Sequence, residues 1–532
     1  MSTPQTTIYV CSGVLLNNSY NNTIWFNDLS AQRAYFMGKV VRTFPAYSYV
    51  RKSWTVNVDA TMEQARTWNY LFFNNGAGKT YYYFINNIEY KNDSTVELFL
   101  ELDVLQTYHL EYVLHPSFVE REHTVSDEPG EHLLDEGLEL GQYTTLRKED
   151  VTELQELCIV LLASVNVNDP SDDAVYKYGQ LYNNQYSGLT YYAARTDDYV
   201  DVGKKLDNLG SKTDGVIGMF MYPKTLIRAY GSDGIADSWA VNPITHDLLS
   251  PARAQEVTIL APVRPTTLDG YVPKNKKLLT YPYNVLYVTN NTGGSAVYRY
   301  ERFTNPANIR FNVVGALGAE ASTKMYPLNY EGVESNYDSG ISGVTFPSCA
   351  WDSDTYKLWL AQNQNQQNHA FLGAGLTIAG GVGALVASAW TGGMTAAAGV
   401  GAIAGGASQI AGLLAQREDM KAQPPQAHGT AGSSVNITNN SNTYTFYLKC
   451  VDAEHARVID DYFTMYGYKA NKVKIPSRNV RPHWTYTKTV GCNVSGNLCN
   501  EDLAKIASIF DKGVTFWKNG DNIGNYALDN TV

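Results

Sequence analysis

The chain has 532 residues, enough for several domains, and its formal net charge of −11 argues against nonspecific nucleic-acid binding through a basic surface. Tyr alone contributes 39 residues, and this aromatic richness with few long helical patterns favours a mainly β protein with short helices. The six Cys residues include no CxxC pair, so a zinc site has no support, and we expect no metal and no cofactor. No basic region followed by an apolar core opens the sequence, so no signal peptide is expected.

Strand patterns dominate the first part of the chain. We predict strands over 8–16 and 53–58, a short helix over 61–73, and a hairpin with strands over 81–90 and 96–104 around a turn at 91–94. The last strand is the clearest, because Val96, Leu98, Leu100 and Leu102 recur at every second position and form one apolar face.

The stretch Gly76–Thr80 (GAGKT) resembles the end of a phosphate-binding loop. That motif requires a Gly five residues before Gly78, where this chain has Phe73. It also requires a strand before the loop and a helix after it, and neither is predicted here. We therefore interpret the stretch as an ordinary loop and not as a nucleotide site.

The segment 120–136 is rich in acidic and imidazole side chains. Its members are Glu120, Glu122, His123, Asp127, Glu131, His132, Asp135 and Glu136. These residue types suit a metal site or paired carboxylates for acid–base chemistry. However, no spacing matches HExxH or an EF-hand loop, and no Ser-His-Asp or Cys-His signature occurs elsewhere. We favour a solvated acidic connector and keep a cell-wall hydrolase that uses this cluster as an alternative.

Continuous apolar runs predict buried strands in the middle of the chain. These strands lie over 157–167, 215–222 and 256–261, around Leu286 and Val288, and over 296–303 and 308–314. Across 168–250 the pattern weakens into Asp, Asn, Gly and Tyr, which is typical of an inserted, surface-displayed region. Receptor binding by that region is a further hypothesis.

The stretch 358–416 contains no Lys, Arg, Asp or Glu. A helix capped by Asp352 or Ser353 is predicted to run through Trp359 and to lead into an Asn/Gln-rich run at 362–368. Beyond this run the composition becomes almost entirely small or apolar.

Two apolar runs, 371–390 and 394–415, are separated by a Thr-Gly-Gly turn. Each is long enough to cross a bilayer as a helix, which needs about 20 residues. The larger side chains that we expect to penetrate a membrane are Phe371, Leu372, Leu376, Ile378, Val382, Leu385, Val386, Trp390, Met394, Val400, Ile403, Ile410, Leu413 and Leu414. Small residues at four-residue spacing predict close helix association, and they are Gly375, Ala379, Gly383, Ala387, Ala397, Gly401 and Gly405. A buried Ala/Gly-rich hairpin and a flexible apolar loop are the alternative interpretations.

After the apolar stretch, soluble β structure is expected to return. We predict a linker at 423–434, strands over 443–451 and 483–490, and helices over 453–465 and 501–510.

Several stretches form a set in a fixed order. They are LFLELDVLQTY (98–108), SFVEREH (117–123), LLDEGLELG (133–141), DGYVPKNKKLLTYPYNVLYVTNNTG (269–293), FPSCAWDSDTYKLWLAQNQN (346–365), YFTMYGYKANKVKIP (462–476), RPHWTYTKT (481–489) and EDLAKIASIFDKGVTFW (501–517). Together they resemble the distal tail tube, or tail knob, proteins of picovirus-type short-tailed bacteriophages. The resemblance reaches from the first 30 residues to the last 20 and is weakest across 168–250.

This resemblance implies a virion protein with no catalytic activity, built of tail-tube-like β modules that assemble as a homo-hexameric tube at the tail tip, next to an adjoining tail or collar protein. Phage DNA would pass through the lumen without sequence-specific binding. Residues 371–416 occupy the position of the family's apolar loops, which plug the tube and then form a pore in the host cytoplasmic membrane. An apolar loop that only seals the tube is the alternative within the same class.

The predicted domain organisation has five parts. They are an N-terminal β-rich tube domain (1–150), an inserted β-rich domain (151–262), a second tube β domain (263–357), the apolar membrane-active loop with its flanking runs (358–434), and a C-terminal β-rich segment that returns to the tube (435–532).

Overall fold

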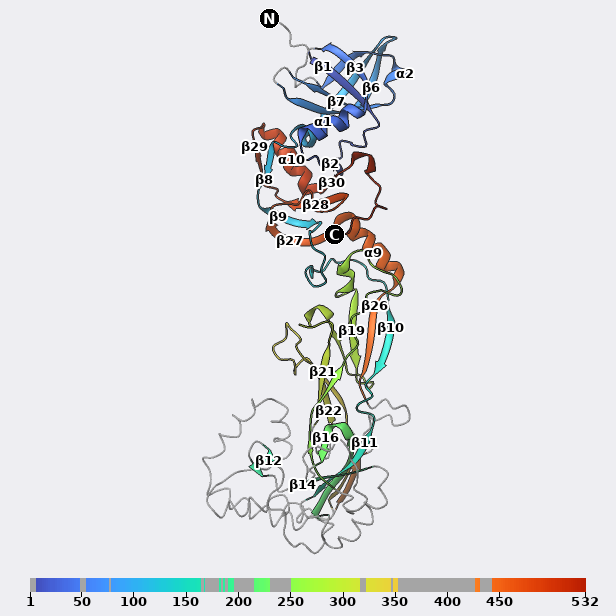
Figure 1. Ribbon diagram of the computed structural model, residues 1–532, viewed down its shortest axis with the longest axis vertical. Helices are drawn as coiled ribbons and strands as arrows, with labels where there is room; N and C mark the ends of the chain where they lie inside the picture. Colours follow the sequence, from blue (N-terminus) through green and yellow to red (C-terminus); the bar gives the residue numbers. More distant parts are fainter. Residues whose placement is uncertain are drawn as a thin grey trace, which may run out of the picture. The chain divides into compact units, whose positions relative to one another are not determined.

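The computed structural model describes residues 6–47, 54–75, 78–163, 167, 181–182, 185–186, 190–195, 215–229, 250–315, 322–345, 348–352, 426–430 and 443–532 (Figure 1). The chain divides into two compact units. Unit 1 comprises Met1–Thr144, Pro265–Asn284 and Cys450–Val532, and unit 2 comprises Thr145–Arg264 and Val285–Lys449. Each unit therefore combines segments that are far apart in the sequence. The five-part organisation proposed from the sequence is not tested by this grouping and stays a prediction.

The N-terminal part of unit 1 is an antiparallel sheet. Its strands are β1 (Thr6–Ser12), β3 (Val40–Tyr47), β4 (Thr55–Asp59), β5 (Trp68–Asn74), β6 (Thr80–Asn92) and β7 (Thr95–Leu102). They follow the order β3-β1-β5-β6-β7-β4. The helices of unit 1 are α1 (Leu29–Gly38), α2 (Met62–Ala65), α3 (Val104–Thr107), η4 (Lys276–Leu279), α9 (Ala453–Tyr466), α10 (Asn500–Lys512) and η8 (Gly520–Asn522).

Helix α1 covers part of this sheet with an aromatic contact (Figure 1). The helix begins at Asp28, whose carboxylate accepts a hydrogen bond from the Ala31 N–H at 2.8 Å. Phe36 is fully buried and stacks on Tyr70 with ring centroids 5.1 Å apart. The core of the N-terminal sheet is therefore organised around Phe36 and the aromatic side chains of β5 and β6.

The C-terminal part of unit 1 is a second sheet. Its strands are β2 (Asn22–Ile24), β9 (Ser117–Glu122), β27 (Tyr468–Lys474), β28 (Trp484–Val490) and β30 (Val514–Trp517). The order is β2-β30-β28-β9-β27, with β2 and β30 parallel and the other pairs antiparallel. Beside it, β8 (Tyr112–Leu114) pairs with β29 (Val494–Gly496). Chain segments before residue 123 thus alternate in this sheet with segments after residue 467.

Helices α9 and α10 pack beside this second sheet. Asp452 caps α9 by accepting hydrogen bonds from the N–H groups of Glu454 and His455. The helix ends at Gly467, which has φ +64°, and a Cβ added there would lie 2.2 Å from the carbonyl oxygen of Glu122. Only glycine fits this turn, because a side chain would collide with the backbone of β9.

Unit 2 is also built mainly of strands. One sheet, in the order β10-β26-β19-β20, contains β10 (Tyr143–Asp150), β19 (Asn284–Thr289), β20 (Ser295–Tyr298) and β26 (Thr445–Val451). A second, in the order β18-β21-β22-β23, contains β18 (Val257–Leu260), β21 (Arg310–Gly315), β22 (Ser322–Pro327) and β23 (Ile341–Thr345).

The third sheet of unit 2 has the order β16-β17-β14-β11-β15-β24-β25. Its strands are β11 (Leu157–Ala163), β14 (Thr190–Arg195), β15 (Val216–Pro223), β16 (Ile227–Ala229), β17 (Ser250–Ala254), β24 (Ser348–Asp352) and β25 (Gln426–Thr430). The remaining elements are β12 (Leu181–Tyr182), β13 (Gln185–Tyr186), η3 (Lys224–Leu226) and η5 (Tyr300–Arg302). The core of unit 2 includes Val160 and Phe220 from this sheet and Phe311 from the second sheet.

The structure confirms many predicted elements and corrects two. The hairpin over 81–104 is β6 and β7, and the two C-terminal helices are α9 and α10. The helix predicted over 61–73 was wrong beyond Ala65, because Trp68–Asn74 forms β5 and pairs with β1 and β6. The strand predicted over 296–303 ends at Tyr298 and is followed by η5. In the first case pairing with distant strands outweighs a helical spacing of apolar residues.

Candidate functional site

The predicted membrane-active residues lie outside the described residues. This holds for all of 371–416, with every large apolar and small residue named above, and for the Asn/Gln-rich run at 362–368. The structure does describe a strand on each side of this segment. β24 ends at Asp352, β25 begins at Gln426, and the two strands pair antiparallel with these residues opposite one another.

This pairing determines where the intervening segment begins and ends. Residues directly opposite in an antiparallel pair have Cα atoms about 4.5–5.5 Å apart. Residues 353–425 therefore leave the sheet and return to it at neighbouring points. β25 is the outermost strand of its sheet, and β24 is held on its other side by β15, with Gly218 opposite Ala350. The segment is thus an excursion tied at both ends to one sheet edge.

Two predictions next to this segment need correction. Asp352 is the last residue of β24 and not a helix cap, while Ser353 and Trp359 lie outside the described residues. The linker predicted over 423–434 contains a strand, β25. Its sequence, QAHGT, has no β-branched or aromatic run, so its strand conformation depends on the partner β24.

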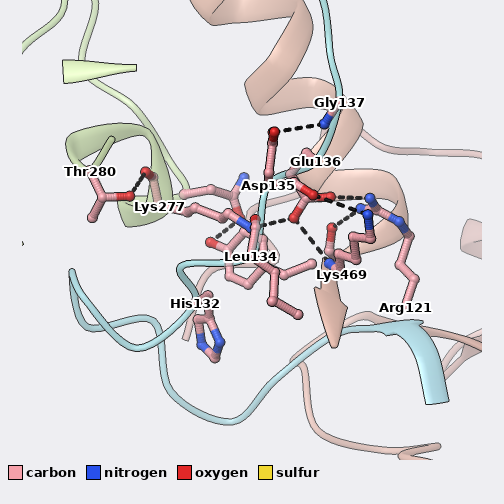
Figure 2. Close-up of polar contacts among 12 residues, drawn as sticks. Arg121, His132, Leu134, Asp135, Glu136, Gly137, Lys277, Thr280 and Lys469 are labelled. Atoms are coloured by element: carbon pink, nitrogen blue, oxygen red, sulfur yellow. Dashed lines mark hydrogen bonds and ion pairs between the residues drawn. The ribbon is translucent and has the colours of Figure 1, made fainter. Parts of the chain in front are cut away.

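The acidic segment 120–136 has a different structure from the predicted solvated connector. Figure 2 shows the Glu136 carboxylate between Arg121 and Lys277, with which it forms two ion pairs. The Glu136 side chain is fully buried, and the side chains of Arg121 and Lys277 are 10% and 2% exposed. Glu136 also accepts a hydrogen bond from the Lys469 N–H at 3.0 Å. Burial lowers the pKa of Lys277, and the neighbouring Glu136 opposes this shift.

Two further buried carboxylates hold the same returning loop. Asp460 is fully buried and accepts hydrogen bonds from the Lys274 N–H at 2.6 Å, the Asn275 N–H at 3.0 Å and the Tyr271 hydroxyl at 2.7 Å. Asp127 accepts from the Lys276 N–H at 2.8 Å and from the Tyr468 hydroxyl. We call residues 271–277, together with Asp127, Glu136 and Asp460, the charged junction of unit 1. It connects three chain segments through backbone hydrogen bonds as well as ion pairs.

Glu122 and His123 are also internal. Glu122 is 1% exposed and pairs with Lys474. The Nδ1 atom of His123 lies 2.7 Å from the Tyr486 N–H, which donates to it, so Nε2 carries the proton and donates to the Thr464 carbonyl. Burial lowers the pKa of His123 to about 3, which keeps the ring neutral. Both ring nitrogens are already engaged, and this arrangement offers neither a metal ligand nor a general base.

The acidic segment therefore provides structural contacts and not a reaction centre. Among the described residues, no group of three or more His, Cys, Asp or Glu side chains is arranged to hold a metal ion. Cys492 and Cys499 are both free thiols, as expected from the sequence. Within the described ranges, no helix has the length and apolar character needed to cross a membrane.

The GAGKT stretch is a hairpin turn, which confirms its interpretation as a loop. It connects β5 to β6, with Asn74 opposite Thr80 and the Asn75 N–H donating to the Lys79 carbonyl at 2.8 Å. The Lys79 ammonium pairs with Glu111 and lies 4.3 Å from the Tyr108 ring centroid. Its charge is therefore already used inside unit 1.

The sequence analysis did not identify the partners of the acidic segment. Lys277, Asp460 and Lys469 contact it across 141 to 333 residues of sequence, as the pairs Lys277–Glu136 and Lys469–Glu136 illustrate. Lys277 and Asn275 do lie in 269–293, the most distinctive stretch of the family resemblance, and that position was the one available signal.

Comparisons with known proteins relate the whole chain to phage tails. Residues 252–531 match the family model described as "Bacillus phage phi29, Tail knob protein gp9, C-terminal domain". Residues 4–112 match the model "Caudoviral major tail protein N-terminus". Tail knob protein gp9 of Bacillus phage B103 is 27% identical, and that of Bacillus phage phi29 is 26% identical; each alignment covers 99% of this chain and 98% of the relative.

A solved structure agrees with this relationship at the level of the fold. The tail knob protein gp12 of bacteriophage C1 aligns with a TM-score of 0.65 over 99% of both chains. The sequence identity is 15%, so this likeness shows a shared fold and nothing more specific. The names of these relatives are those of structural tail proteins rather than enzymes.

Proposed function

The chain belongs to the tail knob protein gp9 family of Bacillus phage phi29, and on that premise we propose that it forms, as a homo-hexamer, the distal tube through which a short-tailed phage ejects its DNA. It is a structural component of the phage tail and not an enzyme. An adjoining tail or collar protein would contact the tube at its other end. The match of residues 4–112 to a tail-protein N-terminus supports the assignment of the first sheet to the tube.

The second part of the proposal concerns the host cytoplasmic membrane. Residues 371–416 plug the tube before infection and then enter the host membrane to form a pore. The observation that supports this role most directly is the β24–β25 pair, which ties both ends of residues 353–425 to one sheet edge. An excursion anchored in this way can move into lipid while the pairs between β11, β14 and β15 stay intact.

The composition of the apolar segment supports the same role. Leu385, Val386 and the other large residues gain free energy on transfer to lipid, whereas Ala and Gly gain little. The small residues at four-residue spacing, from Gly375 to Ala387 and from Ala397 to Gly405, would allow the close helix contacts that an oligomeric pore requires.

Charge favours passage of DNA over binding. Duplex DNA carries about one negative charge per 1.7 Å of axis, so a basic lumen would hold it through many contacts. This chain has a net charge of −11, and Arg121, Lys277 and Lys474 are used in buried ion pairs within unit 1. We expect no measurable retention of duplex DNA at physiological salt; tight binding that weakens with added salt would contradict a sliding conduit.

Release of a dye from liposomes tests the membrane role. The full-length chain is compared with a variant in which 371–416 is replaced by a short Gly/Ser linker. The matched control carries the same type of replacement in 362–368, which shortens the polar part of the same excursion. We expect leakage from the wild type and from the control, and none from the first variant.

The outcomes separate the candidate functions. Equal leakage from wild type and the 371–416 variant would refute membrane penetration by this segment. No leakage from any chain, together with faster loss of DNA from particles that carry the 371–416 variant, would support the second candidate, a loop that only seals the tube.

A further inference from the structure

Three exposed apolar side chains form a continuous row across the second sheet of unit 1. Phe118 on β9 lies opposite Val473 on β27 and opposite Val490 on β28. Directly opposite residues in antiparallel strands project from the same face. Val473 is 69% exposed, Val490 is 56% exposed and Phe118 is 40% exposed. The neighbouring Ser117 and Val119 are buried, which places the core on the other face of β9. We call these three residues the apolar row.

A second apolar surface lies beyond the other end of the same strand. Phe118 is near the start of β9, and the chain leaves β9 after Glu122, about 13 Å further along at roughly 3.3 Å per residue. The loop that follows exposes Val125, Leu133 and Leu134. We call residues 125–135 the acidic loop, because it also exposes Glu131 and Asp135.

The charges beside the two surfaces are opposite. Lys472 precedes Val473 on β27, the edge strand of the sheet, is exposed, and forms no ion pair with the described part of the chain. Glu131 is 49% exposed at its side chain and has only His132 near it, at 3.9 Å. The apolar row therefore has an unpaired cation beside it, and the acidic loop has an available carboxylate.

We propose that the apolar row of one copy binds the acidic loop of the next copy of this chain. The two surfaces differ and lie at opposite ends of one sheet, so the contact is head-to-tail, and such contacts close into rings when the rotation allows it. This inference rests on the proposed homo-oligomeric tube and assigns its contact surfaces. A second copy is the favoured occupant because it alone brings both complementary halves.

Mixing two variants tests the head-to-tail contact. The row variant is V473S/V490S, the loop variant is V125S/L133S, and the matched control is V458S/V272S, which changes two equally exposed valines outside both surfaces. Mass photometry of the full-length chains should show rings for wild type and control. Each test variant alone should show an apparent dissociation constant raised by about 10- to 100-fold.

An equimolar mixture of the row and loop variants should form dimers and stop there. The loop variant retains its row and the row variant retains its loop, so one contact survives in each pair. If the loop variant assembles alone as well as wild type does, or if the wild type stays monomeric at millimolar concentration, the proposal is refuted.

A charge exchange provides the second test. K472E and E131K should each weaken assembly, and the chain that carries both should recover it; no recovery would contradict the pairing of these two surfaces. Circular dichroism verifies the fold of every variant. Dye release from liposomes is measured on the same chains, so that failure of this contact and failure of the membrane role are recorded separately.

Discussion

Replacement of Glu136 by Gln tests whether the charged junction holds unit 1 together. The Glu136 side chain is fully buried, and its removal leaves Lys277, 2% exposed, and Arg121, 10% exposed, without their carboxylate. Loss of one partner from a buried pair typically costs about 3–5 kcal/mol, because the remaining charge stays desolvated. We expect E136Q to lower the free energy of unfolding of unit 1 by about this amount.

Differential scanning calorimetry provides the assay. At roughly 2–4 °C per kcal/mol, the transition of unit 1 should move down by about 6–20 °C. The control is E120Q in the same segment, where the Glu120–Lys488 pair has side chains 37% and 34% exposed and should contribute at most about 1 kcal/mol. Equal shifts for E136Q and E120Q would refute the view that the buried position of Glu136 makes it important.

The pH dependence of E136Q gives an independent readout. Burial lowers the folded-state pKa of Lys277 below its unfolded value, and loss of Glu136 removes a charge that opposes this shift. Between the two pKa values the unfolded chain binds more protons, so the stability of the variant should rise with pH across that window. A stability deficit that is unchanged at alkaline pH would indicate that lost packing, and not an uncompensated charge, causes the effect.

Three further predictions concern unit 1. Burial lowers the pKa of His123 to about 3 and that of His109 to about 4, so below about pH 6.5 the unfolded chain binds more protons and each His should cost roughly 2 kcal/mol of stability at pH 5. Burial raises the pKa of Asp103 to about 6, which acts in the opposite direction, so the measurement is the difference between wild type and H123N in urea unfolding near pH 7 and pH 5; identical pH slopes would contradict it. G467A should cost about 1–3 kcal/mol through backbone strain and more through its collision with Glu122, whereas G13A, with φ +70° and open space around it, should show the strain alone in the same assay. F36A should cost about 3–5 kcal/mol in chemical denaturation, since Phe36 is fully buried against Tyr70; a loss below 1 kcal/mol would show that the aromatic core re-packs.

Local patterns predicted part of this fold well. The alternation from Val96 to Leu102 identified β7, and the spacing of Leu503, Ile506 and Phe510 identified α10, because each pattern reports burial of one face of one element. The absence of charge across 358–416 likewise identified a segment unlike the rest of the chain.

The charged junction could not be predicted in the same way. Glu136 contacts Arg121 across 15 residues, Lys277 across 141 and Lys469 across 333, and no local pattern reports such distances. An acidic run with no visible partners was therefore interpreted as solvated, which was wrong for Glu122, Asp127 and Glu136.

The conformation of β25 shows the same limit. QAHGT at 426–430 has low β propensity and reads as a linker, yet it pairs with β24 along its whole length. This pairing supports the proposal that residues 353–425 are anchored at both ends.

The most direct test of the membrane role uses an environment-sensitive dye on the apolar segment. A single Cys at Leu385 carries an NBD label in a full-length chain whose accessible Cys492 and Cys499 are replaced by Ser, and the control label is at Gln364. On addition of anionic vesicles under conditions that cause dye release, emission from position 385 should shift to shorter wavelength and be quenched by lipid-borne quenchers, while position 364 should change little. Leakage without any spectral change or quenching at position 385 would contradict insertion of this segment into the bilayer.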